Sequence, residues 1–158
     1  MVAWYRRPLA VVALSAAVAG CFQSDDAPSL ATEGGGFIFN YRLAEAYAGI
    51  VVGPRPNRRL PAGASIEVTF ENPAGGSPII MTRDVTTAKQ LRYTFMTPPL
   101  SGVRADTGYA VTVRLITADG SEIERIEKIF RSEVDQSVLP DKPLVIGPGY
   151  TPNPESAE

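Results

Sequence analysis

Residues 109–117 read Tyr-Ala-Val-Thr-Val-Arg-Leu-Ile-Thr, an alternation of apolar and polar side chains that decides the fold class. A period of two is typical of a β-strand with one buried face. The side chains expected on that face are Tyr109, Val111, Val113 and Leu115, with Thr112 and Arg114 on the other. Asp119-Gly120 follows, and this dipeptide readily adopts the positive φ angles of a tight hairpin turn. The stretch therefore predicts a strand that leads into a β-hairpin.

The return segment, residues 121–131, is compatible with two structures. Its apolar side chains have helical spacing: Ile123, Ile126, Ile129 and Phe130. In a helix, Ser121 and Glu124 would form a capping box. In a strand, Ile126 and Phe130 would point inward, and a bulge or the hairpin end would displace Ile123. We favour the strand, because Asp-Gly between two apolar runs is the strongest local hairpin signal.

Short β-rich segments separated by proline, glycine and asparagine occupy the rest of the central chain. Residues 64–71 alternate cleanly, with Ile66, Val68 and Phe70 on one face. Further strands are expected at 37–42, 50–52, 79–81, 91–95 and 144–146, with Leu91, Tyr93 and Phe95 on one face of the fifth segment. The conformation of the alanine-rich stretch before Ile50 stays open. The pattern predicts an all-β protein, a single antiparallel β-sandwich of about seven strands, immunoglobulin-like or transthyretin-like, over residues 36–147.

Two segments outside the predicted sandwich lack any period. Residues 21–35 are mostly polar and end in glycines, which is typical of a flexible tether. Residues 148–158 are rich in proline and glycine and cannot continue an interior strand. We interpret them as a tail that frays after an ordered exit.

The N-terminus has the order of a secretory signal peptide. Arg6 and Arg7 precede an apolar stretch at 9–19, which is too short to span a bilayer as a helix. Val18-Ala19-Gly20-Cys21 then resembles the lipobox of bacterial lipoproteins. The resemblance implies removal of residues 1–20, a diacylglyceryl group on the Cys21 thiol and acylation of the new amine. The alternative is that Cys21 is an incidental small residue after an ordinary secretory signal.

The residue types present exclude several functions. The chain has no histidine and one cysteine, which removes the commonest general base, the commonest metal ligand and any intrachain disulfide. Of its 15 basic residues, Arg6 and Arg7 leave with the signal peptide, so 13 remain against 17 acidic ones. This balance argues against a nucleic-acid partner. We expect no enzyme, no cofactor and no metal site.

Two groups of charged residues are candidates for a functional role. One is acidic and comprises Glu67, Glu71, Glu122, Glu124 and Glu127. We interpret it as a solvated sheet face rather than an acid/base pair. The other is the proline-stiffened loop 54–61, which contains the candidate partner-binding residues Arg55, Arg58 and Arg59. Guanidinium groups there could bind an acidic protein or anionic headgroups, or could simply solvate the loop.

Several stretches resemble the small bacterial lipoproteins of the YbaY/YscW type, which include pilotin chaperones of type III secretion. The matching stretches are Leu60-Pro61-Ala62-Gly63-Ala64-Ser65-Ile66-Glu67-Val68, Tyr93-Thr94-Phe95 with Pro98-Pro99, and the strand from Tyr109 with Asp119-Gly120. Phe22 follows Cys21, where the signal for inner-membrane retention has aspartate. The resemblance therefore implies an outer-membrane lipoprotein that faces the periplasm.

Together these observations predict a lipid-anchored, non-enzymatic envelope protein that contacts another envelope protein through loops or sheet edges. An accessory or chaperone role for an outer-membrane assembly follows from the resemblance. The alternative is a periplasmic carrier of a small ligand, with a pocket lined by inward aromatic side chains: Phe70, Tyr93, Phe95 and Tyr109. An enzyme using carboxylates alone would need two acidic groups facing each other in a cleft.

Overall fold

The computed structural model describes residues 28–86 and 90–157, which form strands joined by turns and two short 3₁₀ helices. The strands are β1 (Leu30–Asn40), β2 (Glu45–Pro54), β3 (Ser65–Phe70), β4 (Ile79–Asp84), β5 (Tyr93–Met96), β6 (Gly108–Ile116), β7 (Glu122–Arg131), β8 (Val145–Ile146) and β9 (Thr151–Pro152). The 3₁₀ helices are η1 (Gln136–Val138) and η2 (Pro154–Ala157). The predicted all-β class is confirmed.

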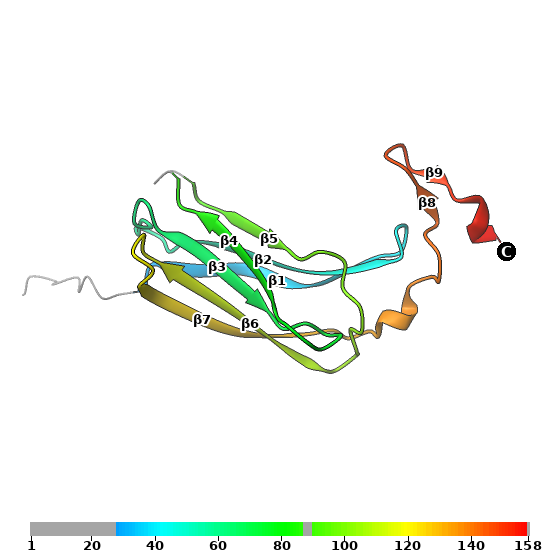
Figure 1. Cartoon of the computed structure of the whole chain (residues 1–158), viewed down its shortest axis with the longest axis horizontal. Helices are drawn as coiled ribbons and strands as arrows, with labels where there is room; N and C mark the ends of the chain where they lie inside the picture. The colour runs from blue at the N-terminus through cyan, green and yellow to red at the C-terminus, as the bar shows by residue number, and fades with distance from the viewer. Residues whose placement is uncertain (1–27, 87–89, 158) are drawn as a thin grey trace, which may run out of the picture.

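Seven of these strands form an antiparallel sandwich of two sheets (Figure 1). One sheet has the order β1-β2-β5 and the other the order β4-β3-β6-β7. The Tyr109 hydroxyl, near the start of β6, accepts a hydrogen bond from the Arg104 amide at 2.9 Å and donates one to the Gly102 carbonyl at 3.3 Å. This arrangement is the tyrosine corner that is typical of immunoglobulin-like sandwiches.

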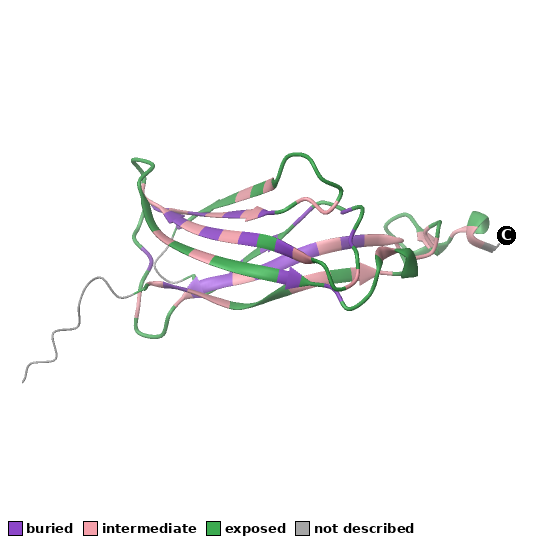
Figure 2. Cartoon of the chain, turned by 90° about the horizontal axis from the view of Figure 1, so that it is seen from below, coloured by how far each residue is buried: buried purple, intermediate pink, exposed green. Residues whose placement is uncertain are grey.

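The core lies between the two sheets and follows the alternation of the sequence. Figure 2 shows buried and less buried residues alternating along the strands. In β3, Ile66, Val68 and Phe70 are buried, as predicted. In β6 the buried side chains are those predicted: Tyr109, Val111, Val113 and Leu115. The alanine-rich stretch belongs to β2, where small side chains let Ala46 and Ala48 pack in the core.

The β6–β7 hairpin confirms the strand interpretation of residues 121–131. Gly120 has a φ of 88° in the turn, and Glu124 pairs with Leu115 while Glu122 pairs with Ile116. Ile123 is therefore the extra residue of a bulge, and its side chain is exposed. Phe130 is buried and Ile126 packs against the core. The bulge explains why the apolar residues of this strand have helical spacing in the sequence: it takes Ile123 out of the strand's period of two.

The predicted tether is too long, because β1 already begins at Leu30. Residues 30–35, predicted as flexible, pair with β2 from Pro54 to Ile50. Their glycines allow close packing instead of flexibility. A Cβ on Gly35 would lie 2.5 Å from the Phe130 ring and 2.8 Å from the Gly49 carbonyl oxygen. Only residues 22–29 therefore separate Cys21 from the first strand.

Leu91 was predicted to share the inward face of Tyr93 and Phe95, and this is wrong. The pairing of β2 with β5 ends at Val52 and Tyr93, so no ladder holds residue 91 in the alternating register. Its side chain is 68% exposed.

The C-terminal segment also differs from the prediction. The expected strand 144–146 does not join the sandwich, because β8 pairs with β9 in a separate hairpin. The tail predicted to fray is held by Asn153, whose amide group donates to the Pro143 carbonyl at 2.8 Å and accepts from the Glu155 amide at 3.1 Å. The Leu144 amide donates to the Arg42 carbonyl at 2.8 Å, so the C-terminal hairpin docks against the β1–β2 turn (Figure 1).

Candidate functional site

The two ends of the sandwich differ in composition, and each contains a candidate site. The tether end is where the chain enters at Ser29, beside loop 55–64 and the 117–121 turn. The far end comprises the β1–β2 turn and the segment 132–157 that docks on it. Figure 1 shows the C-terminus and the start of β1 at opposite ends of the molecule. Cys21, the predicted lipid attachment site, lies outside the described residues.

Two charged side chains fix the chain where it enters the sandwich. The Glu124 carboxylate, on β7, accepts hydrogen bonds from the Ser29 amide at 2.7 Å and the Leu30 amide at 3.1 Å. The Arg55 guanidinium donates from Nε to the Leu30 carbonyl at 2.9 Å, and the Arg55 amide donates to the Ser29 carbonyl at 2.8 Å. The start of β1 is thus held from both sides, and Arg55 has a structural role that sequence reasoning missed.

The arginine-containing loop has a defined conformation. The Arg58 amide donates to the Arg55 carbonyl at 3.0 Å, and Asn57 has a φ of 61°. Proline at the second position and a positive φ at the third are typical of a type II turn. Leu60 is buried in the core and fixes the end of the loop. Arg59 is exposed and Arg58 half-buried, so the structure places both on one rigid loop beside the tether.

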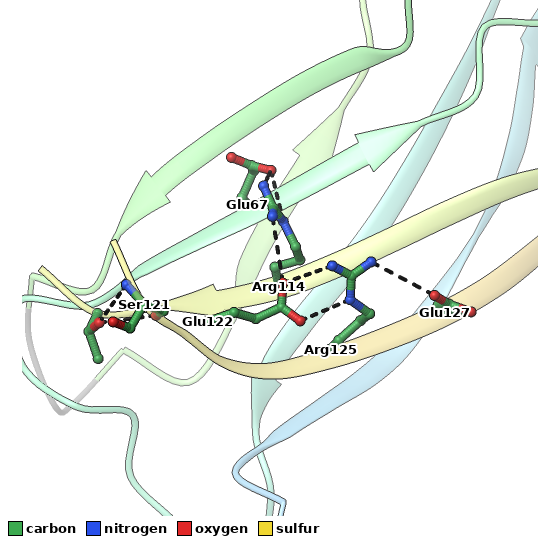
Figure 3. A network of polar contacts seen from close by, with 7 residues as sticks. Glu67, Arg114, Ser121, Glu122, Arg125 and Glu127 are labelled. Atoms are coloured by element: carbon green, nitrogen blue, oxygen red, sulfur yellow. Dashed lines mark hydrogen bonds and ion pairs between the residues drawn. The ribbon is translucent and has the colours of Figure 1, made fainter. Parts of the chain in front are cut away.

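The acidic residues singled out in the sequence are engaged in structural contacts. Figure 3 shows a network across β3, β6 and β7 in which Arg114 contacts Glu67 and Glu122, and Arg125 contacts Glu122 and Glu127. A hydrogen bond from Arg125, with the charge of Arg114 nearby, lowers the pKa of Glu122.

The remaining two carboxylates bind backbone amides. Glu71 accepts from the Ala110 amide at 2.7 Å, and Glu124 holds the start of β1. The five carboxylates therefore make structural contacts on the outer face and edge of one sheet. They do not face one another as an acid/base pair.

The aromatic side chains proposed to line a carrier pocket are packed in the core. They are Phe70, Tyr93, Phe95 and Tyr109. Burial raises the pKa of Tyr93, and its hydroxyl has no hydrogen-bond partner among the described residues. A hollow of about 310 Å³ instead lies on the outer face of the three-stranded sheet, where Gly34, Gly36 and Gly49 leave space beside Ile38 and Met96.

Sequence reasoning missed the apolar surface at the far end. Its side chains are each at least 40% exposed and come from the β1–β2 turn and the C-terminal segment: Tyr41, Val134, Val138, Leu144, Ile146 and Tyr150. We call these six residues the apolar tip. The residues were visible in the sequence, but Leu144 and Ile146 were assigned to a strand of the sandwich at 144–146 and Tyr150 to a fraying tail at 148–158. Neither assignment predicts an exposed apolar surface.

Comparisons with known proteins identify no family. No protein-family model matches the chain, and neither does any curated protein. The crystal structure of an endonuclease/exonuclease/phosphatase from Beutenbergia cavernae DSM 12333 is similar over 63% of this chain, at 13% identity and a TM-score of 0.34. The match covers 28% of that protein's chain. A likeness this low carries no argument about function.

Residues 28–86 and 90–157 contain neither a membrane-spanning helix nor a cluster of metal ligands. Within these ranges no helix has the length and apolar character needed to cross a bilayer. The same residues contain no group of three or more acidic side chains placed to share a metal ion.

Proposed function

We propose that this protein is a lipid-anchored, non-enzymatic lipoprotein of the bacterial outer membrane that binds another envelope protein through its far end. Acylated Cys21 attaches it to the membrane. The sandwich faces the periplasm and presents the apolar tip to the partner. An accessory or chaperone role in an outer-membrane assembly, as in the YbaY/YscW type, fits this arrangement.

One observation carries the proposal. The chain enters the sandwich at one end, while the β1–β2 turn and the segment 132–157 at the opposite end carry six exposed apolar side chains. Exposed apolar patches on soluble domains mark interaction surfaces. A protein that is anchored at one end and has an exposed apolar surface at the other can contact a partner at a distance from the membrane.

The carrier alternative has less support. It requires a ligand among Phe70, Tyr93, Phe95 and Tyr109, and these side chains fill the core. The hollow on the outer sheet face is lined by none of these four side chains; its lining is mostly glycine and aliphatic, with Phe37 and Thr94.

Fatty-acid labelling tests the anchor. Cells that produce the protein would be given a radioactive fatty acid, with Cys21→Ser as the comparison. We expect the wild-type chain to carry the label and the variant to lack it. Equal labelling of both would refute lipidation at Cys21.

Site-directed crosslinking tests the partner surface. A photo-crosslinking residue would replace Tyr150 at the apolar tip or, as the matched control, Ile80 on the outer face of β4, since both side chains are 58% exposed. We expect one envelope protein to be captured from position 150 but not from position 80, and Leu144→Asp with Ile146→Asp to abolish capture. Capture of a secretin would support the pilotin-like role. Identical products from both positions would contradict the proposal.

A further inference from the structure

We propose that the tether end of the sandwich rests on the membrane and that Arg58 and Arg59 bind anionic phospholipid headgroups there. The inference rests on the proposed anchor at Cys21. It assigns a role to the arginine-containing loop and an orientation to the whole domain, with the apolar tip pointing away from the lipid.

The length of chain outside the structure limits how far this end can lie from the bilayer. Eight residues connect Cys21 to Ser29, and an extended chain spans at most about 3.3–3.6 Å per residue, so the start of the sandwich stays within roughly 29 Å of the lipid. The Arg55 amide bonds to Ser29 directly, which places the loop at the point of attachment. Glu124 on β7 bonds to the Ser29 amide as well, so loop 55–64 and the start of β7 are the parts of the sandwich in direct contact with this point.

The chemistry of the loop suits an anionic surface. Residues 54–64 contain three arginines and no acidic residue. Arg55 also bonds to the Leu30 carbonyl and holds the start of β1, so we assign headgroup contact to Arg59, which is exposed, and to Arg58, which is half-buried on the same loop. The type II turn and buried Leu60 preorganise the loop, so little conformational freedom is lost on contact.

An exposed apolar side chain lies beside the loop. Leu91 has the largest exposed fraction among the described large apolar side chains, and its carbonyl oxygen would lie 2.3 Å from a Cβ on Gly53, one residue before Pro54. Arg92 follows and pairs with Glu33 at 2.6 Å. Arginine next to an exposed leucine is the composition of surfaces that bind at the lipid interface.

The acidic groups nearby keep their negative charge, but their oxygens are engaged with groups of the protein itself. The Asp119 carboxylate is held in the 117–121 turn by the Thr117 hydroxyl and the Ser121 amide. Glu124 is engaged with the amides of Ser29 and Leu30. A membrane is favoured over an acidic protein because the tether already holds this end against lipid.

The expected strength is modest and depends on the anchor. Each arginine close to an anionic bilayer favours contact by roughly fivefold, so two arginines favour it by about 25-fold. That is weak for a protein in free solution. It is sufficient when the anchor keeps the loop at millimolar effective concentration over the surface.

The composition of the chain makes the orientation directly measurable. Cys21 is the only cysteine, so residues 21–158 can be coupled through it to maleimide-bearing lipid in vesicles. The only tryptophan, Trp4, is absent from those residues, so an introduced tryptophan is the only one present. Leu91→Trp reports the tether end, and Tyr150→Trp reports the far end. Brominated lipids quench tryptophan on contact.

On vesicles containing about 30% phosphatidylglycerol, we expect brominated lipid to quench Leu91→Trp several-fold more than Tyr150→Trp. Arg58→Glu with Arg59→Glu should remove most of this difference, as should vesicles of phosphatidylcholine alone. The matched control, Arg42→Glu with Arg104→Glu, reverses two exposed charges at the far end and should leave this difference intact. Salt near 1 M, where the Debye length is about 3 Å, should also abolish the difference in quenching between the two tryptophans.

Equal quenching at both positions, or quenching that survives reversal of Arg58 and Arg59, would overturn the inference. If the same reversal instead abolished crosslinking of a protein to the tether end in cells while vesicle quenching stayed unchanged, the loop would be a protein-binding site and the inference would be wrong. Anchoring is imposed chemically in the vesicles, so failure here is distinct from failure of fatty-acid labelling at Cys21.

Discussion

Two buried tyrosine hydroxyls have opposite effects on stability, because one forms hydrogen bonds and the other does not within the described residues. The Tyr109 hydroxyl satisfies the Arg104 amide and the Gly102 carbonyl, and so fixes the turn that leads into β6. The Tyr93 hydroxyl is buried with no partner among the described residues. A buried polar group stabilises a protein when it is bonded and costs free energy when it is not.

Removing each hydroxyl should therefore change stability in opposite directions. Tyr109→Phe should lower the free energy of unfolding by about 1–2 kcal/mol, and Tyr93→Phe should raise it by about 1 kcal/mol. Urea denaturation of the two variants measures both effects. A clear loss of stability in Tyr93→Phe would mean that its hydroxyl bonds to a group outside the described residues.

The glycines of β1 provide a second prediction at the residue scale. Gly35→Ala should destabilise the protein by about 1–3 kcal/mol, because its Cβ would overlap the Phe130 ring and the Gly49 carbonyl. Gly34→Ala is the matched control, since no atom lies within 4 Å of a Cβ there. Thermal unfolding compares the two. Equal stability would show that β1 and β7 can separate without cost.

At the scale of the elements, the Asn153 side chain links both arms of the C-terminal hairpin. Asn153→Ala removes the bonds to the Pro143 carbonyl and the Glu155 amide. Their loss is worth about 1–2 kcal/mol, so amide hydrogen exchange in residues 144–157 should accelerate roughly tenfold while β1–β7 stay protected. Thr151→Ala in the same hairpin is the control. Faster exchange throughout the sandwich would contradict an independent hairpin.

The ionised carboxylates of the turns and outer strands predict a loss of stability in acid. Hydrogen bonds lower the pKa values of Asp119, from Thr117, and Asp135, from the Ser137 amide, below 3.8, and a bond from Arg125 lowers that of Glu122 below 4.5. The folded state then binds fewer protons than the unfolded state. Its stability is complete above about pH 4.5 and falls as the pH drops through the lowered values.

Urea denaturation between about pH 6 and about pH 3 measures this dependence. Arg125→Gln removes the main cause of the shift at Glu122, so the variant should be less stable at pH 6 and should lose less on acidification. An acid slope equal to that of the wild type would contradict the assignment.

The difference between the elements predicted from sequence and those observed has a physical cause. Strands β3 and β6 and the β6–β7 hairpin could be predicted, because alternation and Asp119-Gly120 are local signals. The glycines of β1 resemble a linker until the distance between Gly35 and Phe130 is known. The arginine-containing loop could be found as a group, but the bond from Arg55 to the Leu30 carbonyl is a contact between distant residues. Pairing of that kind has no signature along the chain.

For the whole molecule, the distance between anchor and sandwich decides what each end can reach. Eight residues, 22–29, separate Cys21 from β1, instead of the fourteen, 22–35, that the sequence predicted, and this short span is what brings Arg58 and Arg59 within reach of the proposed headgroups. The C-terminal segment that carries most of the apolar tip lies at the opposite end of the sandwich, so the proposed orientation directs it away from the membrane.

Lengthening the tether should therefore separate the two contacts. Inserting about 20 Gly/Ser residues after Ser24 lowers the effective concentration of the loop at the lipid by about sixfold, since it falls roughly as the −3/2 power of linker length. We expect quenching of Leu91→Trp on anchored vesicles to fall, while crosslinking from position 150 persists, because the tip contacts its partner directly. A scrambled insertion of equal length in the 71–78 loop serves as a control for stability. Loss of crosslinking with unchanged quenching would reverse the assignment and make the tether end the partner surface.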